Sequence, residues 1–142
     1  MTRRKVPVAL AARLRHAGQY RCGYCLHSES LMGIRLEFEH LMPLAAGGLT
    51  EEANLWLSCR NCNGFKQAQT QAADPETAIL TPLFNPRRQV WGEHFRWSHD
   101  GTEIIGRTPP GRATVVALKL NNPLAVSTRG LWVSVGWWPP LS

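Results

Sequence analysis

Several features are missing from this 142-residue sequence, and each absence narrows the class of protein. No apolar run approaches the roughly 18 residues that a membrane span requires, and no secretory signal peptide is recognisable, so we expect a cytoplasmic protein without a membrane partner. Charged residues are scarce, at 18%. Hydrophobic residues nevertheless reach 44%. We therefore expect a folded chain, either one domain or a small module with an extension.

Acidic residues are absent from the first 21 positions, where the basic residues are Arg3, Arg4, Lys5, Arg13, Arg15 and Arg21. The rest of the chain carries equal numbers of acidic and basic residues, so this segment holds the whole formal net charge of +6. An acid-free basic arm, residues 1–20, favours contact with a nucleic-acid backbone. A solvated arm that only aids solubility is the alternative. A mitochondrial transit peptide fits less well, because processing near residue 20 would fall beside Cys22.

Cysteine is also rare, and its four positions form two C-x-x-C pairs, Cys22 with Cys25 and Cys59 with Cys62. Two such pairs supply the four thiolates of a closed tetrahedral zinc site. Disulfides are disfavoured in a protein expected in the cytoplasm, and a redox pair would need only one C-x-x-C. An iron–sulfur centre is the alternative metal site. The 33 residues between the pairs exceed the spacing of a simple zinc ribbon, which indicates a functional insertion.

The segment around the cysteines predicts a strand, a loop, a second strand and a helix. Residues 34–39 alternate apolar and charged side chains, and residues 55–58 are apolar enough for the returning strand. Proline and glycine make residues 41–53 a loop, and helix-forming residues predict a helix over 60–72. Ahead of them, the stretch 7–16 predicts a short basic helix.

The extension, residues 74–142, predicts a β-hairpin followed by two helices. Asp100-Gly101 suits a two-residue turn that places Trp97 opposite Ile104. Helices are expected after Thr108-Pro109 and after Asn122-Pro123, although residues 131–137 also fit a strand. The side chains expected inward are Ala113, Val116, Ala117 and Leu120 in the first helix, and Leu124, Thr128, Leu131 and Val135 in the second.

Four polar residues lie between and beside the cysteine pairs: Glu39, His40, Asn54 and Asn63. Phosphodiester hydrolysis needs a base that activates water and a divalent cation with open coordination positions. A neutral histidine provides the base, and a carboxylate with an amide oxygen provides cation ligands. Because strand alternation sends Glu39 and His40 to opposite faces, we expect a bend near His40.

The order C-x-x-C, E-H, N, C-x-x-C-N, x-x-K resembles the HNH endonuclease family. The matching segments are Cys22-Gly-Tyr-Cys25, FEHLMPLAAGG ending at Gly48, and NLWLSCRNCNGFK from residue 54 to 66. The resemblance implies an α+β fold, the zinc-braced ββα-metal module over residues 21–73. It also implies cleavage of DNA to 5′-phosphate and 3′-hydroxyl ends, with structural zinc and catalytic Mg²⁺ or Mn²⁺.

By position, the resemblance assigns a role to each polar residue. His40 is the general base, Glu39 and Asn63 hold the catalytic cation, and Asn54 braces the loop around the base. Lys66 contacts phosphate. Glu39 stands where aspartate is commoner in the family. The third motif residue is Asn63, so the three motif residues are His40, Asn54 and Asn63.

Further nucleic-acid contacts are expected from basic residues at the arm and the knuckles: Arg3, Arg4, Lys5, Arg21 and Arg60. A catalytically inactive zinc-braced module that binds nucleic acid is the alternative function, and a structural zinc protein with a protein partner is a third. Nicking against double-strand cleavage, DNA against RNA, and the oligomeric state stay open, as does the role of the extension, which is expected to pack on the module.

Overall fold

The computed structural model describes residues 5–141, and the chain forms two compact units. Unit 1 comprises Met1–Thr70 and Asn85–Arg88, and unit 2 comprises Gln71–Phe84 and Gln89–Ser142. Helices and short two-stranded sheets occur together, so the predicted α+β class is confirmed. The expected packing of the extension on the module stays a prediction. Among the described residues, no helix is long and apolar enough to cross a membrane.

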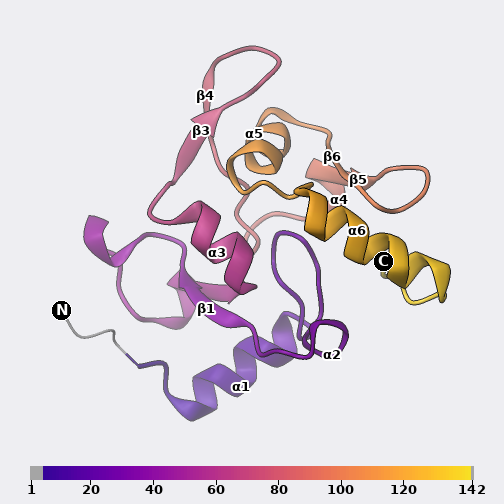
Figure 1. The fold of residues 1–142 in the computed structure, drawn as a ribbon. Coiled ribbons are helices and arrows are strands. Elements are labelled where there is room, and N and C mark those ends of the chain that lie inside the picture. Colours follow the sequence, from indigo (N-terminus) through magenta and orange to yellow (C-terminus); the bar gives the residue numbers. More distant parts are fainter. Residues whose placement is uncertain (1–4, 142) are drawn as a thin grey trace. The chain divides into compact units, whose positions relative to one another are not determined.

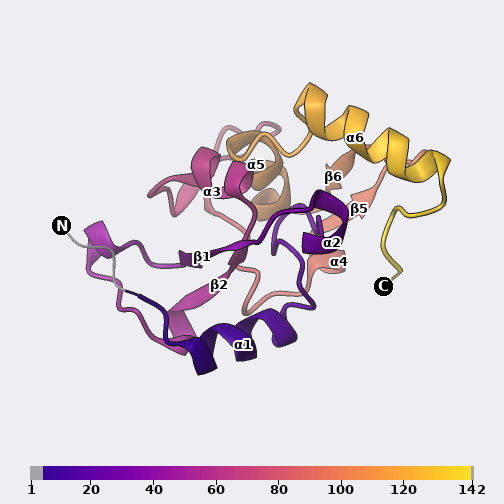
Figure 2. The same cartoon turned by 60° about the horizontal axis from the view of Figure 1, so that its bottom comes forward.

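Unit 1 opens with helix α1, Val8–Ala17, which confirms the predicted basic helix. Its buried residues are Leu10 and Leu14, which form a hydrophobic core cluster with Leu55. Figure 2 shows α1 running beside strand β2. This packing gives a short helix the tertiary support that isolated helices of such length lack.

A β-hairpin and a helix form the centre of unit 1. Strands β1, Glu37–His40, and β2, Leu55–Ser58, pair antiparallel from Glu37 opposite Ser58 to His40 opposite Leu55. Helix α3, Arg60–Lys66, follows β2 directly and contacts β1 (Figure 1). The predicted order of strand, loop, strand and helix is confirmed. Unit 1 also holds the short helix α2, Glu29–Met32, which Ser28 caps at its N-terminus.

Helix α3 is shorter than predicted, because it ends at Lys66 instead of continuing to residue 72. Gln67 adopts a positive φ of 51°, and the Gln69 side-chain amide donates to the carbonyl oxygens of Phe65 and Lys66. These bonds satisfy carbonyls that would otherwise accept from a further helical turn. The next residues form strand β3, Gln71–Ala73.

Unit 2 contains two hairpins and three helices. Strand β3 pairs with β4, Leu80–Pro82, and β5, Phe95–Trp97, pairs with β6, Ile104–Gly106. The helices are α4, Trp91–His94, α5, Pro109–Ala117, and α6, Pro123–Ser134. The β3–β4 hairpin and α4 were not predicted from the sequence.

The β5–β6 register confirms the prediction, with Trp97 opposite Ile104. The turn differs, because the Gly101 amide donates to the Ser98 carbonyl oxygen. Asp100 therefore occupies a central turn position, and Gly101, at φ 77°, follows it. The six-residue connection between the strands accounts for the difference, since a hydrogen-bonded turn forms within it.

Both predicted helix starts in unit 2 are confirmed. The Thr108 hydroxyl accepts from the Gly111 amide, and the Asn122 side chain accepts from the Ala125 amide. The strand alternative for residues 131–137 is wrong, because α6 continues to Ser134. Both helices carry proline in the first turn, where its missing N–H costs no helical bond.

The prediction of which side chains of these two helices point inward was partly wrong. Ala113 and Leu120 are buried, but Val116 is 57% exposed. The α6 stripe is exposed at Leu124, Leu131 and Val135, whereas Arg129 and Trp132 are its buried residues. Arg129 donates to the carbonyl oxygens of Leu120 and Thr102, and these bonds turn the arginine face of α6 inward.

Candidate functional site

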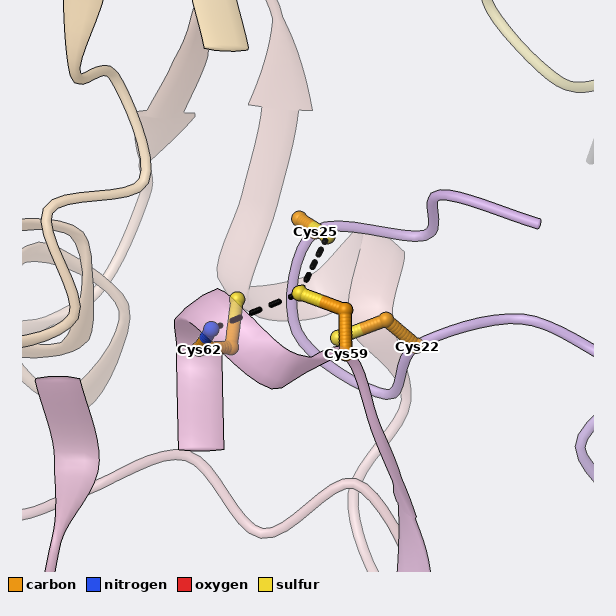
Figure 3. Close-up of side chains that lie close together, drawn as sticks. All are labelled: Cys22, Cys25, Cys59 and Cys62. Atoms are coloured by element: carbon orange, nitrogen blue, oxygen red, sulfur yellow. Dashed lines mark hydrogen bonds between the residues drawn. The ribbon is translucent and has the colours of Figure 1, made fainter. Parts of the chain in front are cut away.

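The four cysteines lie together in unit 1. Cys22 and Cys25 come from the loop after α1, whereas Cys59 precedes α3 and Cys62 lies in its first turn (Figure 3). Their sulfur atoms all lie within 4.8 Å of one another, and the Sγ atoms of Cys25 and Cys59 are 3.7 Å apart. A tetrahedron with zinc–sulfur bonds of about 2.3 Å has sulfur–sulfur edges of about 3.8 Å.

The cluster therefore fits structural zinc, as the sequence predicted. All four cysteines are free of disulfides and buried. Main-chain amides also support the sulfurs, because the Cys62 amide donates to Cys59 Sγ and the Tyr24 amide donates to Cys22 Sγ. Such bonds orient metal ligands and fix the geometry of the site.

Strand β1 presents two carboxylates toward helix α3. Alternation places Glu37 and Glu39 on one face, and each contacts a different side chain of the helix. Glu37 Oε1 accepts from Asn63 Nδ2 at 2.9 Å, and Glu39 Oε1 lies 3.2 Å from Lys66 Nζ. Glu39 and Asn63, predicted to share a cation, therefore each have another protein partner on the neighbouring element.

Glu39 is a buried carboxylate in which only one of the two oxygens has a hydrogen-bond partner. Oε1 accepts from the Tyr24 hydroxyl at 2.7 Å and pairs with Lys66, whereas the buried Oε2 has no hydrogen-bond partner. Burial raises the pKa of the Glu39 carboxyl, while the Lys66 ammonium and the Tyr24 hydroxyl act in the opposite direction. A buried carboxylate oxygen without a donor is costly unless a cation or another ligand completes it.

His40 lies at the end of β1, on the strand face opposite Glu39. Its Nε2 atom is 2.9 Å from the Thr50 hydroxyl, which comes from the loop between the strands. The strand pairing stays regular through His40, so the expected bend does not appear in the register. The contact with Thr50 sets the plane of the ring within the loop.

Asn54 holds the two ends of that loop together. Its Oδ1 accepts from the Met42 amide at 2.7 Å, and its Nδ2 donates to the carbonyl oxygens of Met42 and Leu49 at 3.0 and 2.9 Å. Gly48 also lies inside this turn, where an added Cβ would clash with the Met42 carbonyl oxygen. The loop carrying Thr50 is thus tied to the strand end that carries His40.

The predicted nucleic-acid contacts fall in different environments. Lys5 and Arg60 are exposed, whereas Lys66 is buried with its ammonium group on Glu39. Arg21 is half-buried and donates to the Leu26 carbonyl oxygen. Arg3 and Arg4 lie outside the described residues.

Two arginines of α1 are engaged within unit 1. Arg13 pairs with Glu52, and Arg15 pairs with Glu29, both at 3.2 Å. Arg15 also lies over the ring of Phe38, 4.6 Å from its centroid. Part of the N-terminal positive surplus is therefore balanced inside the protein by acids distant in sequence.

Three residues of the site were missed from the sequence: Tyr24, Glu37 and Thr50. Strand alternation carried the signal for Glu37, because it stands two residues before Glu39. Tyr24 and Thr50 gave no comparable signal, since their partners lie 15 and 10 residues away on other elements.

Fold and site together define a zinc-braced module of a β-hairpin and a helix, with carboxylates, a histidine and amides around the hairpin. Residues 22–69 match the family model described as HNH endonuclease. The match over this segment confirms the resemblance that the sequence indicated. Comparison with curated proteins and with solved structures gave no match.

Proposed function

We propose that the protein is a metal-dependent endonuclease that hydrolyses DNA phosphodiester bonds by nicking or double-strand cleavage. The observation that carries the proposal is the complete set of Glu39, His40, Asn54 and Asn63 inside the family match. Each belongs to the hairpin, its loop or α3, so one compact module holds the base and the cation ligands.

His40 is the general base in this proposal. A neutral imidazole takes a proton from the attacking water, whose oxygen forms a bond to phosphorus as the bond to the 3′-oxygen breaks. The products carry a 5′-phosphate and, after protonation of the leaving oxygen by solvent, a 3′-hydroxyl. The Thr50 hydroxyl orients the ring, and Asn54 holds the loop that presents Thr50.

Glu39 and Asn63 are proposed to hold Mg²⁺ or Mn²⁺. The fit rests on donor chemistry, because Glu39 Oε2 is an unpartnered buried carboxylate oxygen and Asn63, on the helix that contacts β1, supplies an amide oxygen. The bound cation supplies charge neutralisation for the phosphate. Exposed Arg60 and Lys5, with Arg3 and Arg4, are proposed to contact the nucleic-acid backbone.

Plasmid cleavage tests this proposal. Wild-type protein, His40→Ala and the control His16→Ala, an exposed histidine of α1, are incubated with supercoiled DNA in Mg²⁺, in Mn²⁺ and without divalent ions, with zinc content measured for each. We expect cleavage by wild type and His16→Ala only with a divalent ion, and none by zinc-loaded His40→Ala. Equal cleavage by His40→Ala would contradict the role of His40.

One observation favours the alternative of a non-catalytic nucleic-acid-binding module. Lys66 already pairs with Glu39, so the negative charge of this buried carboxylate is balanced without a divalent ion. Salt-dependent DNA binding by wild type, without cleavage in any divalent ion, would establish that alternative. RNA substrates belong in the same assay.

A further inference from the structure

Tyr24 lies inside the first cysteine pair and makes bonds at both of its ends. Its main-chain amide donates to Cys22 Sγ at 3.4 Å, and its hydroxyl donates to Glu39 Oε1 at 2.7 Å. The side chain is fully buried. One residue therefore joins a sulfur of the zinc cluster to the carboxylate of β1.

The hydroxyl of Tyr24 is suited to act as a permanent donor. A phenol has a single donor hydrogen, and Tyr24 directs this hydrogen to Glu39 Oε1. A tyrosine has two rotatable side-chain bonds and is held on all sides, whereas Lys66 reaches Glu39 through a flexible four-carbon stem. Tyr24 is thus the more rigid of the two partners of Oε1.

The two donors on Oε1 fix which carboxylate oxygen is left for another ligand. A carboxylate that accepts two bonds at one oxygen cannot rotate without breaking them. Oε2 is held in one orientation, buried and without a hydrogen-bond partner. A prearranged ligand atom of this kind loses less freedom when it binds a cation.

We propose that Tyr24 is a positioning residue that couples the zinc cluster to divalent-cation binding by Glu39. This inference rests on the proposed function, since it takes Glu39 as a cation ligand. Zinc fixes the Cys22–Cys25 turn, the turn fixes the Tyr24 ring, and the hydroxyl fixes the Glu39 carboxylate. Order in the zinc cluster is thereby passed to the second metal site through one side chain.

The first test measures Mn²⁺ binding to the full-length, zinc-loaded protein by electron paramagnetic resonance, in parallel with plasmid cleavage. The variant is Tyr24→Phe, which removes only the hydroxyl oxygen. Tyr20→Phe is the matched control, because Tyr20 is the other tyrosine of the chain and is half-exposed. Zinc content and thermal unfolding are measured for every protein.

We expect Tyr24→Phe to keep its zinc and to bind Mn²⁺ about tenfold more weakly, because one charge-assisted hydrogen bond to the ligand is lost. Tyr20→Phe should match wild type. An unchanged Mn²⁺ affinity in zinc-loaded Tyr24→Phe would overturn the inference while leaving the nuclease proposal intact. If wild type itself neither binds Mn²⁺ nor cleaves DNA, the proposed function fails and the inference fails with it.

A second measurement needs no variant at Tyr24. Cobalt substituted for zinc gives thiolate charge-transfer bands that report on the sulfur environment. We expect Mg²⁺ to shift these bands in the wild-type protein and not in Glu39→Gln. Bands that stay fixed while Mg²⁺ binds would show that the two sites are independent and would overturn the coupling, even if Tyr24→Phe does not fold.

Discussion

Replacing Asn54 by alanine should open the loop between β1 and β2 without unfolding the hairpin. The side chain makes three bonds, one from the Met42 amide and one to each of two loop carbonyls. Each intramolecular hydrogen bond contributes about 0.5–1.5 kcal/mol net. Because Asn54 is half-exposed and water replaces part of the loss, each bond contributes in the lower half of this range, about 0.7 kcal/mol, and we expect about 2 kcal/mol in total.

Amide hydrogen exchange is the assay, because it reads the loop and the strands separately. The Gly48 amide donates to the Pro43 carbonyl oxygen and not to the Asn54 side chain, so it reports loop opening. A loss of about 2 kcal/mol corresponds to exchange about 30-fold faster at Gly48. The Leu41 amide donates to the Asn54 main-chain carbonyl oxygen and should change little.

The control is Asn61→Ala, which replaces an exposed asparagine on α3 and should change exchange rates by less than about threefold. Unchanged exchange at Gly48 in Asn54→Ala would refute the reasoning, since the loop would then be held by something other than the Asn54 side chain. Equal acceleration throughout β1 and β2 would also refute it, because that result means global unfolding.

Three further predictions concern zinc, acid and glycine. Removing zinc with a chelator should abolish the cooperative thermal unfolding transition of unit 1, which calorimetry measures, because the cluster joins the loop after α1 to the start of α3. The Arg112 guanidinium is the largest influence lowering the pKa of Asp74, to about 2, so stability present above about pH 4 should be lost as pH falls toward 2. The Asp74→Asn variant should lose the contribution of Asp74 to this pH dependence of stability. It should keep the contribution of Asp100, whose pKa is also lowered to about 2. In denaturant titrations, Gly48→Ala should destabilise unit 1 because a Cβ has no room there, whereas Gly64→Ala, with open space in α3, should stabilise it by about 0.5–1 kcal/mol.

The hairpin, its loop and the start of α3 were predictable because local rules determine them. Alternation marked the first strand, apolar residues marked the return strand, and proline with two glycines marked the loop. The cysteine spacing predicted the cluster that the structure brings together. In unit 2, the caps at Thr108 and Asn122 were readable because capping uses a side chain three residues from its partner.

The end of α3 and the buried face of α6 were not predictable from propensity or periodicity. The Gln69 side chain ends α3 by taking its last carbonyls, although glutamine is a good helix former. Arg129 is buried in α6 because carbonyls from Leu120 and Thr102 receive its guanidinium. Both outcomes depend on polar partners that only the folded chain brings close.

The pairing between β1 and α3 explains why Glu39 and Asn63 each have a protein partner that the motif did not indicate. Two residues along a strand advance about 6.7 Å, and three residues along a helix advance about 4.5 Å. These two spacings are similar enough for the long side chains of both elements to pair, which gives the contacts Glu37 with Asn63 and Glu39 with Lys66.

Glu39 and Asn63 lie diagonally in this arrangement, each held by a partner that is not itself a proposed cation ligand. The Asn63 Nδ2 atom donates to Glu37, so the side-chain oxygen Oδ1 is not used in this bond. Glu39 holds Lys66 and Tyr24 at one oxygen and leaves the other without a donor. The strand face thus carries two carboxylates against a single buried ammonium, and this surplus of negative charge is the electrostatic argument for the divalent cation that we propose at Glu39 and Asn63.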